Sequence, residues 1–189
     1  DDAEHARAKR QLDTIRDEVN RLEEIVSGFL SLAKEREIKP EPTRIDSILT
    51  ECVRLIKKDA EERDIRLLTE LRAGDTQLEL DPKQWTRAIL NVLLNAMDAC
   101  PEGGRVRLFS RLTDSSCQVE VRDDGPGMPK EVLERAFDPY FTTRPTGTGL
   151  GLSITRGIVE EHGGSIQLTS EEGQGCQVLI TIPLERSPV

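Results

Sequence analysis

Two asparagines and an aspartate recur at helical spacing in the segment NVLLNAMDA, at residues 91–99. Asn91 and Asn95 are four residues apart and Asp98 follows three residues later, so all three side chains should project from one side of a helix. Carbonyl and carboxylate oxygens are hard ligands that suit Mg²⁺, which usually shares its coordination sphere with phosphates. The amides could instead cap neighbouring backbone, and this segment alone does not decide between the two interpretations.

The segment VRDDGPGM, at residues 121–128, contains acidic residues that are followed by two glycines. A strand that ends at Asp123 and turns through Gly125 and Gly127 would place a carboxylate where backbone can approach a flat ligand closely. Because a carboxylate only accepts hydrogen bonds, it can select an exocyclic amino group such as that of adenine. An ordinary turn between two elements is the alternative.

A glycine-rich loop precedes a predicted helix in GTGLGLSI, where Gly147, Gly149 and Gly151 alternate with Thr148 and Leu150. Free loop amides and a helix N-terminus together form a cradle for anions, so phosphates would bind here. The spacing fits neither G-x-G-x-x-G nor G-x-x-x-x-G-K-[ST].

Between these two glycine-rich stretches lies AFDPYFTTRP, which ends in Thr142, Thr143 and Arg144. The segment concentrates aromatic residues in a chain that is only 3% aromatic. Two interpretations are open, a flexible cover over a bound nucleotide or a hydrophobic plug with a polar tip.

Alternating helices and strands are predicted around these motifs. Asp81 offers an N-cap and Pro82 a first-turn residue for the helix that carries the asparagines. Strand pairs too closely linked for parallel pairing predict a mixed sheet, and the whole predicts an α+β domain built as a two-layer α/β sandwich. Helices are predicted over 46–63, 82–99 and 152–162, and strands over 65–72, 76–80, 105–112, 117–123, 164–170 and 176–184.

A different element is predicted upstream, over residues 3–36. Its apolar residues advance by alternating threes and fours, the repeat of a coiled-coil-type helix that packs along another helix. Pro40 and Pro42 then end the helix. We therefore predict an interaction helix in residues 1–40 and a catalytic domain in residues 41–189. The repeat consists of Leu12, Ile15, Val19, Leu22, Val26, Phe29 and Ala33.

The charge, hydropathy and cysteine content of the chain disfavour several classes of function. A net charge of −9 disfavours nucleic acid and anionic membrane surfaces, which need clustered cations. No apolar run approaches the length of a membrane-spanning helix. The four cysteines are far apart without a C-x-x-C pair, which predicts reduced thiols, a cytoplasmic setting and no zinc site. Of the two histidines, His5 should be solvated and His162 should be a structural residue at a helix end.

Taken in order, the four motifs resemble the ATP-binding domain of sensor histidine kinases, in particular the nitrogen-regulation-like class. NVLLNAMDA resembles the N box, DDGPG the G1 box, FDPYFTT the F box and GTGLGL the G2 box of that family. The resemblance covers about residues 43–185 and implies the Bergerat (GHKL) ATPase fold, with the upstream helix similar to the second helix of the dimerisation and phosphotransfer hairpin. It implies ATP and Mg²⁺ as cofactors.

The resemblance also implies roles for single residues. Asn95 should hold Mg²⁺ and Asp123 should bind the adenine amino group. Candidate catalytic residues are Asn95, Asn91 and Arg144. Candidate nucleotide-binding residues are Asn91, Asn95, Asp98, Asp123, Gly125, Gly127, Thr142, Thr143, Arg144, Gly147, Thr148, Gly149, Leu150 and Gly151.

Two positions distinguish this chain from proteins of the fold and family that it resembles. ATPases of this fold carry a Glu four residues before the metal-binding Asn, whereas this chain has Asn91 there, and an amide cannot accept a proton from water. Phosphotransfer is therefore favoured over hydrolysis. Many family members carry a Lys where this chain has Asp98, so positive charge beside the phosphates would have to come from Arg144 or Arg87.

The sequence holds no H-E-x-x-[NT]-P phosphoacceptor motif. We therefore expect a kinase fragment that binds Mg-ATP but does not phosphorylate itself. The acceptor His would lie on a missing first helix of the hairpin, and a receiver Asp of a response regulator would take the phosphoryl group next. Self-association is expected through the N-terminal helix. Two alternatives are an anti-sigma-factor-type serine kinase and a noncatalytic dimer module with a vestigial nucleotide site.

Overall fold

The computed structural model describes residues 38–144 and 147–184. Each of the predicted helices and strands between residues 46 and 184 is present, and its ends agree with the prediction within one or two residues. The predicted helix over 3–36 lies outside the described residues. The elements are β1 (Glu41–Arg44), α2 (Ile45–Glu62), β2 (Arg66–Arg72), β3 (Gln77–Leu80), α3 (Pro82–Ala99), β4 (Arg105–Leu112), β5 (Ser116–Asp123), α4 (Lys130–Leu133), α5 (Gly151–Glu161), β6 (Ser165–Ser170) and β7 (Cys176–Pro183).

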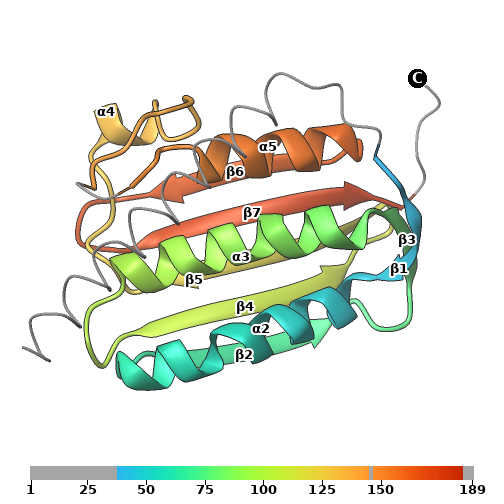
Figure 1. Cartoon of the computed structure of the whole chain (residues 1–189), viewed down its shortest axis with the longest axis horizontal. Coiled ribbons are helices and arrows are strands. Elements are labelled where there is room, and N and C mark those ends of the chain that lie inside the picture. The colour runs from blue at the N-terminus through green and yellow to red at the C-terminus, as the bar shows by residue number, and fades with distance from the viewer. Residues whose placement is uncertain (1–37, 145–146, 185–189) are drawn as a thin grey trace, which may run out of the picture.

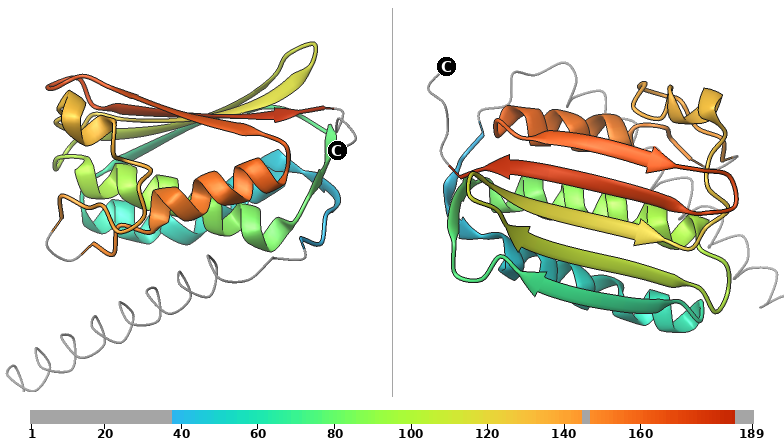
Figure 2. Two further views of the ribbon diagram at one scale, coloured as in Figure 1. Left: turned by 90° about the horizontal axis from the view of Figure 1, so that it is seen from above. Right: turned by 180° about the vertical axis from the view of Figure 1, so that it is seen from behind.

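Five strands form one mixed sheet in the order β2-β4-β5-β7-β6. β2 and β4 are parallel because β3 and α3 intervene between them as a crossover, whereas the other neighbours are antiparallel. Helices α2, α3 and α5 cover one face, and no helix among the described residues covers the opposite face (Figures 1 and 2). The predicted two-layer α/β sandwich with a mixed sheet is confirmed.

The strand predicted over 76–80 does not join this sheet. β3 instead pairs with β1, which the sequence analysis did not predict, in a separate two-stranded sheet at one end of the layers (Figure 1). Leu78 and Leu80 of β3 are buried in the core, and Asp81 follows at once as the N-cap of α3. The short ribbon therefore closes the end of the sandwich where α3 begins.

Helix α3 is held at its start as predicted. The Asp81 carboxylate accepts hydrogen bonds from the backbone N–H groups of Lys83 at 3.1 Å and Gln84 at 3.2 Å, and Pro82 occupies the first turn. Its inner face buries Trp85, Ile89 and other apolar side chains completely against the sheet and α2. On its side away from α2, α3 packs against α5, where Ala88 is buried with Leu150, Ile154 and Ile158 (Figure 1).

His162 is the structural helix-end residue that the sequence predicted. It ends α5, and its ring is buried at an edge-to-face contact of 5.5 Å with Trp85. Nε2 accepts a hydrogen bond from the backbone N–H of Asp81 at 3.0 Å, so Nδ1 carries the proton and donates to the carbonyl oxygen of Ile158 at 2.7 Å. The ring thus ties the end of α5 to the start of α3.

His162→Ala should lower the free energy of unfolding by about 3 kcal/mol, because it leaves a buried amide unpaired and opens a cavity beside Trp85. Chemical denaturation followed by Trp fluorescence measures this effect, since Trp85 is the single tryptophan. An unchanged denaturation midpoint would contradict the assigned role.

Within the described residues, no helix combines the length and apolar character needed to cross a membrane.

Candidate nucleotide-binding site

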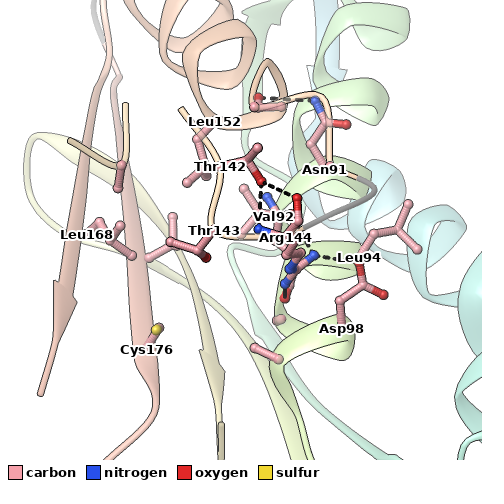
Figure 3. A pocket seen from close by; sticks show the side chains of 18 of the residues that line it. Asn91, Val92, Leu94, Asp98, Thr142, Thr143, Arg144, Leu152, Leu168 and Cys176 are labelled. Atoms are coloured by element: carbon pink, nitrogen blue, oxygen red, sulfur yellow. Dashed lines mark hydrogen bonds and ion pairs between the residues drawn. The ribbon is translucent and has the colours of Figure 1, made fainter. Parts of the chain in front are cut away.

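A pocket of about 550 Å³ opens between α3, the N-terminal end of α5 and the sheet (Figure 3). It collects residues that lie far apart in the sequence, from the N-box, F-box and G2-box motifs together with the end of β5. Arg87 also lines it, whereas Gly125 and Gly127 do not. The predicted residues in its wall are Asn91, Asn95, Asp98, Asp123, Thr142, Thr143, Arg144, Gly147, Thr148, Gly149, Leu150 and Gly151.

Asp123 forms the buried polar end of the pocket, with only 8% of its surface exposed. Its Oδ1 accepts hydrogen bonds from the backbone N–H groups of Gly125 at 2.9 Å and Cys176 at 3.2 Å. Both bonds end on the same oxygen, which leaves Oδ2 for a ligand. Burial raises the pKa of the carboxyl group, and the two amides and Arg144 only partly offset this effect. A buried acceptor of this kind favours a ligand that donates a hydrogen bond.

The glycine turn after Asp123 brings two segments of backbone into contact. Gly127 has φ +72°, and a Cβ atom there would lie 2.0 Å from the carbonyl oxygen of Glu171, in the turn between β6 and β7. A Cβ atom at Gly125 would lie 2.6 Å from Asp123 Oδ1 and 2.9 Å from the carbonyl oxygen of Ala99. Both glycines therefore permit close packing beside Asp123 without lining the pocket themselves. The sequence analysis expected them to face the ligand.

The N-terminal end of α5 is built to leave amide groups available. No side chain caps this end. The carbonyl groups there are occupied: Ser153 Oγ donates to the carbonyl oxygen of Leu150 at 2.9 Å, and Thr155 Oγ1 donates to that of Gly151 at 2.9 Å. Asn91 Nδ2 also donates to the Gly151 carbonyl at 3.3 Å. The N–H groups of the first turn and the positive end of the helix dipole therefore lie where the glycine pattern predicts an anion cradle.

Gly149 permits the loop to pack against the F-box segment. Its φ is +68°, and a Cβ atom would lie 2.5 Å from the carbonyl carbon of Tyr140 and 2.7 Å from the carbonyl oxygen of Phe141. Arg135 stacks on the Phe141 ring, with 4.2 Å between the guanidinium carbon and the ring centre. The F-box segment therefore supports the glycine loop from outside, and Phe141 also lines the pocket.

Arg144 lies across the last turns of α3 (Figure 3). Its Nη1 contacts Asp98 Oδ2 at 2.6 Å and Asn95 Oδ1 at 3.5 Å, and its Nη2 donates to the backbone carbonyl oxygen of Asn95 at 2.9 Å. The Asn95 side-chain oxygen predicted to hold a metal ion therefore already faces a cation. In the described part of the chain, no cluster of three or more His, Cys, Asp or Glu side chains suggests another metal site.

An apolar wall completes the pocket opposite α3, and sequence reasoning did not find it. Its residues come from α4 and the turn after it, from β6 and β7, and from the turn after β5. Met128 and Ala136 stand at the ends of the motifs VRDDGPGM and AFDPYFTTRP, but their apolar side chains gave no signal of a ligand. The strand residues read as ordinary core, and only the folded structure brings the set together. The wall residues are Met128, Val132, Ala136, Leu168, Cys176 and Val178.

Comparison with known proteins agrees with this geometry. Residues 80–186 match the family of histidine kinase-, DNA gyrase B-, and HSP90-like ATPases, a range that includes α3, the glycine turn and the cradle. The chain belongs to this ATPase family. A solved catalytic domain of the histidine kinase ThkA superposes with a TM-score of 0.71 at 31% sequence identity, covering 77% of this chain and 96% of that domain. Within the family, the described residues thus correspond to a histidine kinase catalytic domain.

Curated histidine kinases of this ATPase family align over more of the chain. The sensor histidine kinase ZraS of Escherichia coli K12 is 34% identical over 169 residues, which are 88% of this chain and 36% of ZraS. Sporulation kinase E of Bacillus subtilis 168 is 32% identical over 174 residues, 92% of this chain and 24% of that kinase. The chain therefore spans about a quarter to a third of the length of these relatives.

Proposed function

We propose that this chain is the ATP-binding catalytic part of a sensor histidine kinase and transfers the γ-phosphate of ATP to a histidine that this sequence does not supply. The observation that carries the proposal is the buried Asp123 carboxylate at one end of a pocket whose other end is an uncapped helix N-terminus. A carboxylate acceptor fits the adenine amino group, and free amides fit phosphates.

Asn95 fits a role in holding Mg²⁺. Its side-chain oxygen lies 3.5 Å from the Arg144 guanidinium, so this oxygen already faces a positive charge. When bound, Mg²⁺ would neutralise phosphate charge during transfer. Asn95 would hold it together with the phosphates, and Thr142, Thr143 and Thr148 also line the pocket.

Asn91 supports phosphotransfer over hydrolysis. Its amide nitrogen donates to the Gly151 carbonyl and joins α3 to α5, so the side chain serves to fix the cradle. An amide also has no basic group that could take a proton from an attacking water. The proposed catalytic contribution of this chain is therefore to bind and orient the nucleotide, to place Arg144 beside the phosphates and to leave water without a general base.

The proposed protein partners of this chain are inferred from its relatives. A solved structure of ThkA with the response regulator protein TrrA aligns with 94% of this chain and 51% of ThkA, at a TM-score of 0.80 and 30% identity. By analogy we propose that a response-regulator receiver domain takes the phosphoryl group from the acceptor His. Self-association through the predicted helix in residues 3–36, a division of the chain near residue 40 and a cytoplasmic location belong to the same proposal.

Calorimetric titration of the purified chain tests the nucleotide site. ATP should bind about tenfold more tightly with Mg²⁺ than with excess EDTA, because the metal screens phosphate charge beside Asp98. A noncatalytic module with a vestigial site should show no metal-dependent heat. Label transfer from ATP to a supplied protein that carries a histidine phosphotransfer hairpin then tests the reaction, and labelling of a serine instead would favour the serine kinase alternative.

A further inference from the structure

We propose that Asp98 is a positioning residue that acts through Arg144: it fixes the guanidinium where it distinguishes ATP from ADP. The inference rests on the proposed nucleotide site and assigns to it the source of positive charge beside the phosphates. Position 98 on α3 carries an anion, so the cation at this place in the pocket comes from a loop residue, Arg144.

The Asp98 carboxylate is held at both oxygens. Oδ2 accepts from Arg144 Nη1 at 2.6 Å, and Oδ1 accepts from Arg63 Nη1 at 2.7 Å. A carboxylate bound on both sides cannot rotate without losing one partner, so Arg63 fixes the direction in which Oδ2 points. The position of the Arg144 guanidinium is therefore set from α2 as well as from α3.

Arg63 is itself anchored. It is the C-cap residue of α2, and its Nε donates to Asp59 Oδ1 at 2.9 Å in the preceding turn. Asp59, Arg63, Asp98 and Arg144 thus form a line of alternating charges from the end of α2, across α3, to the pocket. The hydrogen bond to Asp98 is the first cause of a raised pKa at Arg63.

The last turn of α3 adds a second attraction for the guanidinium. Arg144 Nη2 donates to the Asn95 carbonyl oxygen, near the negative end of the helix dipole. The guanidinium is thus directed by oxygen atoms of two residues on one helix, Asn95 and Asp98. A lysine in place of Arg144 could not reproduce this planar arrangement, because an ammonium group is a point charge.

The solvent exposure of these ion pairs indicates that they position the Arg144 guanidinium rather than stabilise the fold. The side chains of Arg63, Asp98 and Arg144 are 43%, 40% and 36% exposed. Pairs this exposed are screened by solvent and contribute little to stability. Their effect should therefore appear in ligand selectivity, with a small change in the melting temperature. The pairs also offset the repulsion that an isolated Asp98 would exert on phosphate.

A double-mutant cycle tests the inference with Asp98→Asn, Arg144→Gln and the double variant. Affinities for Mg-ATP and Mg-ADP are measured by calorimetry. Each single variant should lose about tenfold of the preference for ATP over ADP, and the double variant should lose no more than either one, because both changes remove the same contact. Asp98→Glu, which keeps a carboxylate, should retain most of the preference.

Two outcomes would overturn the inference. One is tighter ATP binding by Asp98→Asn that persists with Arg144→Gln, which would mean that Asp98 only repels phosphate. The other is additive losses in the double variant. Arg54→Gln is the matched control, because Arg54 forms a comparable exposed pair with Glu51 on α2 and does not line the pocket. Wild-type protein that binds no nucleotide would refute the proposed function itself, whereas normal binding with an unchanged ratio in Asp98→Asn would refute this inference alone.

Discussion

Asp123→Asn should bind Mg-ATP about 100-fold more weakly than the wild type and yet unfold at a higher temperature. Asn keeps an oxygen for the amides of Gly125 and Cys176 but presents an NH₂ group where the carboxylate had Oδ2. Two donors would then face one another at the adenine amino group, and a charge-assisted hydrogen bond would be lost. Calorimetry gives the affinity, and thermal unfolding without nucleotide gives the stability.

The gain in stability of Asp123→Asn over the wild type should increase as the pH rises from acidic to neutral. Burial raises the pKa of Asp123 above its ordinary value of 3.8. The folded state therefore holds this proton more tightly than the unfolded state, and the stability that this provides is lost as pH rises through the raised pKa. Below pH 3.8 the carboxyl group is protonated in both states, so wild type and Asn variant should differ least there and most at neutral pH.

Asp124→Asn is the matched control for this pair of effects. Asp124 is adjacent in sequence but pairs with Arg105 at 2.7 Å and Arg107 at 2.9 Å, outside the pocket. Hydrogen bonding to Arg105 first, and also to Arg107, lowers the pKa of its carboxyl group. The variant should keep its ATP affinity and lose a little stability at neutral pH. Equal affinity losses in both variants would show that Asp123 does not recognise the base.

Gly149→Ala should destabilise the domain by at least about 2 kcal/mol and weaken Mg-ATP binding about 100-fold or more. A residue with a side chain resists φ +68°, and its Cβ would lie within 2.7 Å of backbone atoms of Tyr140 and Phe141. Backbone cannot yield as a flexible side chain can, so the loop must move and its amides leave the cradle. Denaturation and calorimetric titration measure the two effects.

Gly157→Ala provides the contrast on the same helix. Gly157 lies within α5, and a Cβ there would meet no atom within 4 Å. This variant should bind ATP normally and gain about 0.5 to 1 kcal/mol of stability, because Ala favours the helical backbone. Loss of ATP binding in this variant would mean that α5 tolerates no change, and the result with Gly149 would then carry no information about the loop.

The sequence predicted the helices and strands well where the hydrophobic periodicity was regular and where capping residues or prolines marked the ends. Asp81 and Pro82 marked the start of α3, and the alternating strands gave β4, β5 and β7. The strand of β3 was predicted, but β1 and its pairing with β3 were missed, because β1 is only four residues long and contains Pro42, which argues against pairing. The four-residue spacing of Asn91 and Asn95 predicted that both side chains project from one side of α3.

The rest of the site depends on long-range contacts that no local pattern contains. The amide of Cys176 reaches Asp123 across 53 residues, and Gly127 is glycine because Glu171 approaches it from another turn. In the sequence, the acidic residue at position 98 looked like a departure from the family pattern. The structure explains it, because Asp98 pairs with Arg63 and Arg144. Charge partners of this kind arise from the packing of helices, which sequence spacing does not reveal.

The strand order has a consequence for how the protein matures during synthesis. β6 precedes β7 in the chain, and among the described strands it pairs with β7 alone, which lies between β6 and β5. Until residues near 176 have left the ribosome, Asp123 lacks one of its two amide partners and β6 has no neighbour to pair with. A nascent chain should therefore acquire affinity for ATP abruptly rather than gradually, at the moment the β6–β7 hairpin closes, and nucleotide captured at that moment would favour the finished sheet.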